Sequence, residues 1–271
     1  MSESVTRSIS GVVYVVLLIA ATLFSHYTFL ALFAAFLLIG TNEFCNLTNL
    51  NKLQAIAISS ILFCIFSFFP SSTLTIFCLI GATLFVSIKL IFLLFNHQNI
   101  KFDTVSKFVY LIGYVVLPII ILTKIPLKIM GVDFKPDVII SIFILIWTND
   151  TFAYIVGKSI GKTKLFESIS PKKTIEGFVG GVIFAIIASV IIAMYYVQMP
   201  IYLWIIIAIL VGIFGTIGDL VESKFKRTAN VKDSGTIMPG HGGILDRLDS
   251  VIFVAPFIYL FLQILQLFTY D

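Results

Sequence analysis

Six acidic residues stand inside or at the edge of long apolar stretches in the second half of the chain. They are Asp150, Glu176, Asp219, Glu222, Asp246 and Asp249. Acidic side chains in such surroundings are energetically costly and usually serve a function. Asp219 and Glu222 are three positions apart, as are Asp246 and Asp249, so each pair would lie on one face of a helix. Carboxylates held this close repel each other unless a cation lies between them.

A hard divalent cation is one way to neutralise these pairs. Mg²⁺ prefers oxygen ligands, typically one or two carboxylates together with substrate phosphates. The alternative is ordinary ion pairing with neighbouring basic residues such as Arg247. Because both clusters would lie on one face of a membrane, the pattern favours the metal. Ser223 would share the helix face of Asp219 and Glu222.

Basic residues complement the acids in the segment 157–177, which reads GKSIGKTKLFESISPKKTIEG. Ser170 followed by Pro171 predicts a helix start, which places Lys172 and Lys173 in the first helical turn. Cations oppose the helix dipole there unless an anion binds the free N–H groups. The segment therefore indicates an anion site. The alternative is ordinary cytoplasmic lysines, which we prefer for Lys164, and helix packing explains the Gly177–Gly181 spacing.

A glycine-rich segment, GTIMPGHGG, follows at 235–243. Its four glycines and one proline predict a tight loop whose backbone can approach a ligand closely. His241 is the only one of the three histidines near the acids. We expect it to contact substrate or to orient the loop.

The elements that position these residues are membrane helices. The chain has 271 residues, of which 59% are hydrophobic and 12% charged, and its mean hydropathy is +1.08. Soluble proteins carry about 45–50% apolar and about 25% charged residues. The composition therefore predicts an all-α polytopic integral membrane protein. Spans of about 20 apolar residues give nine helices, near 9–25, 28–46, 53–69, 73–95, 107–123, 137–157, 173–197, 201–224 and 247–269.

Charge placement predicts the orientation. With residues 158–172 and 225–246 inside, only Lys124, Lys128 and Lys135 of the 18 basic residues lie outside, as the positive-inside rule requires. Nine spans then put the N-terminus inside and the C-terminus outside. The six acids converge on the cytoplasmic interface. We assign 1–125 to a lipid-facing helical scaffold and 126–271 to helices that carry the catalytic site.

The run from Ser223 to Asp249, SKFKRTANVKDSGTIMPGHGGILDRLD, closely resembles the signature of the phosphatidate cytidylyltransferases, also called CDP-diacylglycerol synthases. The matching positions are Ser223, Lys226, Arg227, Lys232, Asp233, Pro239, Gly240, His241, Gly242, Gly243, Asp246, Arg247 and Asp249. Upstream, the segments 149–154 and 157–164 and the run Ser170, Pro171, Lys172, Lys173, Thr174 and Glu176 also resemble the family. The motif resemblance covers about 149–249. In the N-terminal half only Glu43-Phe44 faintly resembles the family.

The resemblance implies a nucleotidyltransferase that converts CTP and phosphatidic acid into CDP-diacylglycerol and pyrophosphate at the cell membrane, in phospholipid biosynthesis. It implies Mg²⁺, held by Asp219, Asp246 and Asp249 with Glu222, and a second, monovalent cation such as K⁺. Catalytic groups would further include Lys226, Arg227, Lys232, Asp233, His241 and Arg247. Substrate contacts would come from Asp150, Lys158, Lys162, Ser170, Lys172, Lys173, Thr174, Glu176, Ser223, Gly242 and Gly243.

Two other functions are compatible with parts of the pattern. CTP-dependent polyprenol or phytol kinases share some of the C-terminal motif, but the complete Pro-Gly-His-Gly-Gly and Asp-Arg-x-Asp pair favours the cytidylyltransferase. An ion-coupled transporter would place carboxylates at the membrane midplane in two related halves, whereas these acids cluster at one interface. We expect no nucleic-acid partner and leave a homodimer open. The sequence does not distinguish CTP from dCTP or assign each lysine to a phosphate.

Overall fold

The computed structural model describes residues 3–69, 71–95, 102–127, 134–197 and 199–269, and it confirms an all-α polytopic membrane protein. The long helices are α1 (Glu3–Phe24), α2 (His26–Thr48), α3 (Lys52–Phe68), α4 (Thr73–Phe95), α7 (Pro136–Ile160), α8 (Ile175–Tyr195), α9 (Ile201–Thr228) and α10 (Leu245–Thr269). A π-helical segment, η1 (Leu111–Val116), joins α5 (Thr104–Tyr110) to α6 (Leu117–Lys124) in one span. Two short strands, β1 (Lys164–Phe166) and β2 (Ser170–Thr174), pair antiparallel.

The predicted helices are found within a few residues of their expected positions. Eight spans in the described ranges are long and apolar enough to cross a membrane, and α3 is a shorter apolar helix of 17 residues. The predicted count of nine spans is therefore not confirmed. The first predicted break is confirmed at Ser25, whose hydroxyl caps α2 by accepting from the Thr28 N–H at 3.1 Å. Pro70, Gln198, Lys101 and Lys128, which entered the other breaks and the charge count, lie outside the described residues.

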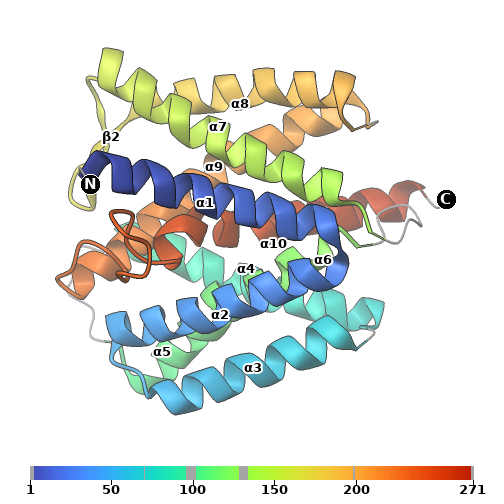
Figure 1. The fold of residues 1–271 in the computed structure, drawn as a ribbon, viewed down its shortest axis with the longest axis vertical. Coiled ribbons are helices and arrows are strands. Elements are labelled where there is room, and N and C mark those ends of the chain that lie inside the picture. The colour runs from blue at the N-terminus through green and yellow to red at the C-terminus, as the bar shows by residue number, and fades with distance from the viewer. Residues whose placement is uncertain (1–2, 70, 96–101, 128–133, 198, 270–271) are drawn as a thin grey trace.

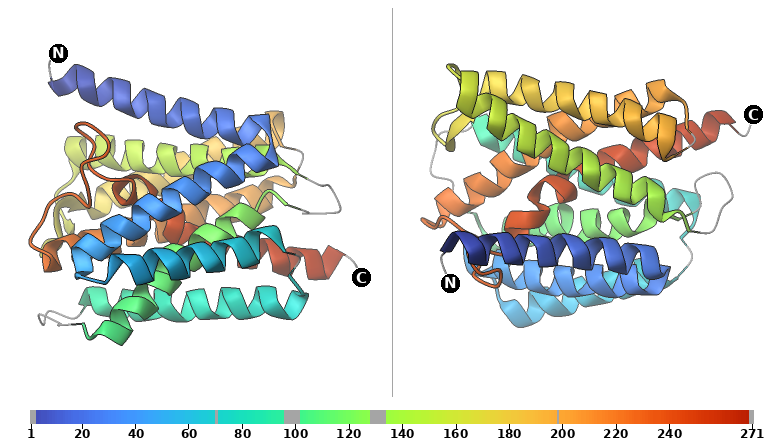
Figure 2. Two further views of the ribbon diagram at one scale, coloured as in Figure 1. Left: turned by 60° about the horizontal axis from the view of Figure 1, so that its bottom comes forward. Right: turned by 45° about the horizontal axis from the view of Figure 1, so that its top comes forward.

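The helices lie side by side, and successive spans run in alternating directions when α5, η1 and α6 are counted as one (Figures 1 and 2). The first turn of α1, the β1–β2 hairpin and the 229–244 loop all lie at one end of the molecule, which we call the hairpin end. The last turn of α10 lies at the opposite end. The first turn of α1 and the last turn of α10 thus lie at opposite ends of the molecule. Which face meets the cytoplasm stays a prediction.

Glycines allow α7 and α8 to pack closely. A Cβ atom on Gly177 would lie 2.6 Å from the backbone oxygen of Ala153, and one on Gly181 would lie 2.7 Å from that of Asn149. Real Cβ atoms do not approach other atoms so closely. The packing role predicted for the Gly177–Gly181 spacing is confirmed, and this contact fixes how Asp150 and the start of α8 lie relative to each other.

The predicted helix start at Ser170 is wrong. Ser170 and Pro171 belong to β2, and α8 begins at Ile175. Thr174 is the N-cap, because its hydroxyl accepts a 3.1 Å hydrogen bond from the N–H of Gly177. The fixed φ of proline suits an extended strand as well as a first helical turn, so the Ser-Pro pair alone does not decide between them. Lys172 and Lys173 therefore precede the helix.

Candidate functional site

Lys226 joins the two predicted acid clusters. It forms an ion pair with Glu222, one helical turn earlier on α9, and a second with Asp246 on α10, where Nζ lies 2.6 Å from Oδ1. All three side chains are largely buried, with exposed fractions of 11% for Lys226, 1% for Glu222 and 5% for Asp246. The cation between these carboxylates is thus an ammonium group of the chain itself.

Asp246 also fixes the glycine-rich loop. Its Oδ2 atom accepts hydrogen bonds from the Ser234 N–H at 2.8 Å, the Ser234 hydroxyl at 2.8 Å and the Gly243 N–H at 2.7 Å. Gly242, at φ +87°, has a backbone that other residues rarely adopt. Both oxygens of Asp246 are therefore engaged, one with Lys226 and one with the loop.

Glu43 on α2 caps the start of α10 from the other half of the chain. Its carboxylate accepts from the N–H groups of Ile244 at 3.0 Å and Leu245 at 2.9 Å, and from the Ser234 hydroxyl at 3.2 Å. The first N–H groups of a helix lack partners within it, and a carboxylate suits the positive end of the helix dipole. Only 4% of the Glu43 residue is exposed.

Three further carboxylates lie within electrostatic range of Glu222 or of one another. Asp249 on α10 is close enough to interact electrostatically with Asp219 on α9 and Asp150 on α7, and Glu222 interacts with both Asp249 and Asp246. The five acids therefore form a continuous group, which we call the carboxylate row: Asp150, Asp219, Asp249, Glu222 and Asp246. Four of them were predicted as metal ligands, and the fifth, Asp150, was predicted to contact substrate.

Lys173 neutralises the other end of the carboxylate row. Its Nζ lies 2.6 Å from Oδ2 of Asp219, whose Oδ1 accepts a 3.2 Å hydrogen bond from the Ser223 hydroxyl. Asp249, in the middle, accepts a 2.7 Å hydrogen bond from the N–H of its neighbour Ser250. In the ranges that the structure describes, no ion pair reaches Asp249.

Glu176, in the first turn of α8, fixes the backbone that leads into the hairpin. The Glu176 carboxylate accepts from the N–H groups of Lys162 and Thr163, each at 3.1 Å, and from the Thr163 hydroxyl at 2.9 Å. Lys164 donates to the Pro171 backbone oxygen at 2.7 Å, in agreement with the ordinary structural role preferred for it. Glu176 and Thr174 thus make structural contacts, and the substrate contacts expected of them stay predictions. Lys158, Lys162 and Lys172 are exposed.

His241 faces α1 and makes a polar contact with it. Its Nδ1 atom lies 2.7 Å from the Ser10 hydroxyl, which also lies 3.0 Å from the backbone oxygen of Pro239. This supports the loop-orienting role for His241. Burial, and then the positive charges of Arg247 and Arg7, lower the pKa of His241 and favour the neutral imidazole.

The remaining predicted residues lie on the surface of the hairpin end. Arg227, Lys232, Asp233 and Arg247 are exposed, and Arg227 donates to the backbone oxygen of Val231 at 3.3 Å. Exposed basic side chains at this end can attract a polyphosphate.

The carboxylate oxygens of the row are the donor type that a hard cation such as Mg²⁺ prefers. Asp150, Asp219 and Asp249 lie on three helices and interact electrostatically with one another. Glu222 and Asp246 are instead occupied by Lys226. Among the described side chains, no group of three or more His, Cys, Asp or Glu residues is already gathered in a metal-binding arrangement. The magnesium site therefore stays a prediction.

Two residues of this site were not predicted from the sequence, apart from the faint family resemblance at Glu43. Glu43 is an acid inside an apolar span, which is the same signal that singled out the six acids of the second half. Ser234 is one of many serines, and no spacing indicated that its hydroxyl lies between Glu43 and Asp246.

Comparisons with known proteins identify one family. A family model described as "Cytidylyltransferase family" matches residues 5–265. A phosphatidate cytidylyltransferase of Bacillus subtilis is 51% identical over 123 residues, which cover 45% of this chain and 45% of that protein. One of Staphylococcus saprophyticus is 53% identical over 122 residues, covering 44% and 46%. The chain thus matches less than half of the length of each of these relatives.

Proposed function

This chain belongs to the cytidylyltransferase family, and we propose that it transfers the cytidylyl group of CTP to phosphatidic acid. The products would be CDP-diacylglycerol and pyrophosphate. The observation that carries the proposal is the carboxylate row with its two lysines, gathered at the end of a bundle of membrane helices. There a lipid headgroup and a soluble nucleotide can meet. The names of the relatives, phosphatidate cytidylyltransferase, support the choice of substrates.

The reaction needs little covalent chemistry from the protein. An oxygen of the phosphatidate phosphate attacks the α-phosphorus of CTP, a new P–O bond forms, and the bond from that phosphorus to the bridging oxygen of pyrophosphate breaks. The attacking phosphate is already ionised, so no proton must be removed first. Phosphoryl-type transfer depends mainly on positioning and charge neutralisation.

The residues of the chain divide this work by position. Five basic side chains are exposed at the hairpin end and attract the triphosphate and the lipid phosphate. They are Lys162, Lys172, Arg227, Lys232 and Arg247. Glu43, Asp246 and Ser234 hold the glycine-rich loop so that its backbone presents one surface to the nucleotide.

Asp219 and Asp249, with Asp150 beside them, would hold Mg²⁺. When bound, the ion would neutralise charge on the phosphates. Lys173 would then be released from Asp219 to contact a phosphate. We further propose that the hairpin end faces the cytoplasm, where CTP is available, as the distribution of basic residues predicts.

The test uses the purified chain in detergent micelles with phosphatidic acid and CTP labelled at either the α- or the γ-phosphorus. Cytidylyl transfer places only the α-label in the lipid fraction, and EDTA should abolish it. A lipid kinase, supplied with a polyprenol or phytol, would instead place the γ-label in the lipid. Absence of lipid label from α-labelled CTP, with phosphatidic acid shown to be in the micelles, would overturn the proposal.

A further inference from the structure

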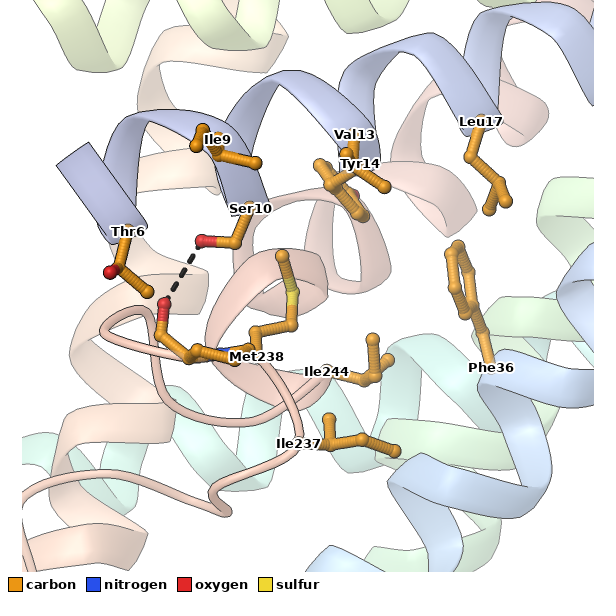
Figure 3. A pocket seen from close by; sticks show the side chains of 11 residues that line it. Thr6, Ile9, Ser10, Val13, Tyr14, Leu17, Phe36, Ile237, Met238 and Ile244 are labelled. Carbon is orange, nitrogen blue, oxygen red and sulfur yellow. Dashed lines mark hydrogen bonds between the residues drawn. The ribbon is translucent and has the colours of Figure 1, made fainter. Parts of the chain in front are cut away.

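An apolar cleft of about 430 Å³ lies between α1, the middle of α2 and the glycine-rich loop. We call it the α1 cleft. Figure 3 shows Thr6 and Ser10 at one end and Leu17 and Phe36 at the other, with Met238 and Ile244 below α1. From Thr6 to Leu17 the helix rises roughly 16 Å at 1.5 Å per residue. The cleft is thus elongated, polar at the hairpin end and apolar towards the middle of the span.

The α1 cleft lies along an exposed apolar helix, so in a membrane it would be surrounded by lipid rather than water. α1 is long and apolar enough to span a membrane, and only 17% of its most apolar stretch is buried. Val13 and Leu17, which line the cleft, are 58% and 46% exposed. A volume of this size lies within the range of ligand sites, about 300–1,000 Å³. A hydrocarbon chain from the bilayer can therefore enter sideways without crossing water.

The α1 cleft shares the glycine-rich loop with the candidate functional site. Its floor is the loop that Asp246 and Glu43 hold in place through Ser234, Gly243 and Ile244. At its polar end, the Ser10 hydroxyl contacts His241 and Pro239 of the same loop. The Tyr14 hydroxyl, also in the lining, donates to the backbone oxygen of Arg247 at 3.4 Å. A chain lying in the cleft would bring its headgroup to the basic hairpin end.

We propose that the α1 cleft holds one acyl chain of the phospholipid substrate and so selects substrates by chain length. The headgroup end of that chain lies beside Ser10, and its terminal methylenes lie between Leu17 and Phe36. This inference rests on the proposed function, because it assumes that a phospholipid reacts at the carboxylate row. Chain-length selectivity would then arise in the N-terminal half, away from the reacting groups.

The experiment narrows the deep end of the cleft with Leu17→Trp. The matched control is Leu23→Trp, on the same helix, because Leu23 is 55% exposed and does not line the cleft. kcat/KM is measured in mixed micelles for dioleoyl and dioctanoyl phosphatidic acid, with CTP saturating. Leu17→Trp should lower the ratio of long-chain to short-chain kcat/KM about tenfold, the loss expected when about two methylene groups can no longer enter the cleft. Leu23→Trp should leave the ratio unchanged.

The outcomes separate this inference from the proposed function. If the wild-type chain forms no CDP-lipid from either substrate, the proposed function fails. If it does, and Leu17→Trp and Leu23→Trp give the same ratio, bulk lipid alone fills the cleft and the inference is wrong. Should Leu17→Trp not fold, Leu17→Phe and crosslinking by phosphatidic acid with a diazirine at its acyl end replace it. Crosslinks confined to helices other than α1 and α2 would contradict the inference.

Discussion

The ammonium group of Lys226 lies 2.6 Å from the carboxylate of Asp246, on the neighbouring helix, while it also pairs with Glu222. Because both acids are nearly fully buried, removing the lysine would leave two uncompensated carboxylates. Breaking a buried ion pair costs about 3–5 kcal/mol. Lys226→Met should therefore lower the thermal unfolding temperature sharply in detergent. Arg227→Met, which removes the exposed neighbouring cation, should leave it nearly unchanged, and equal effects would disprove a structural role for Lys226.

A substitution at Glu43 tests how far the glycine-rich loop and the start of α10 depend on its carboxylate. Glu43→Gln keeps the shape of the side chain but places an NH₂ group against one of its N–H or hydroxyl donors. A buried donor left without an acceptor costs about 1–3 kcal/mol, so we expect reduced thermal stability and a lower kcat. The control is Glu167→Gln, in the exposed turn of the hairpin. Wild-type stability and turnover for Glu43→Gln would show that the cap is dispensable.

Asp249 tests the centre of the carboxylate row. Asp249→Asn removes one charge where no ion pair within the described ranges compensates it, so the fold should persist. Turnover should fall about 100-fold or more, as when other electrostatic groups of active sites are removed. The matched control is Asp137→Asn at the far end of α7, where Asp137 accepts a 3.2 Å hydrogen bond from Tyr196. Near-wild-type CDP-lipid formation by Asp249→Asn would refute the role in metal binding.

The orientation can be measured with single cysteines. Cys45, Cys64 and Cys78 are first replaced by alanine, and Lys232→Cys or Lys135→Cys is added. Lys232 lies at the hairpin end and Lys135 precedes α7 at the opposite end. In intact cells, a membrane-impermeant maleimide should label the cysteine at 135 and reach the one at 232 only after permeabilisation. The reverse pattern would invert the proposed topology.

The sequence predicted the helices well because charge-free apolar runs determine where a chain can cross a membrane. It also predicted that six acids would gather, and five of them do, since i, i+3 spacing and depth along a helix are simple geometry. The sixth, Glu176, instead accepts hydrogen bonds from Lys162 and Thr163. The helix start at Ser170 was wrong because Pro171 suits two backbone conformations, and a hydroxyl at Thr174 took over the cap.

The partners of the acids were not predictable from spacing. Asp246 was expected to bind metal, yet its oxygens contact Lys226, Ser234 and Gly243, which lie 3 to 20 residues away along the chain. Glu43 contacts residues about 200 positions later. Such contacts depend on how the helices pack, which no local sequence pattern reveals.

The cap on α10 has a consequence for biogenesis. Glu43 and Leu245 are 202 residues apart, so the ribosome delivers α2 to the membrane well before its partners have been synthesised. Until then the Glu43 carboxylate must stay protonated, remain hydrated at the membrane surface or bind another donor for a time, because an unpaired charge is costly in lipid. The nascent N-terminal half is therefore an incomplete insertion intermediate, and translation of the last helix supplies the backbone donors that complete it.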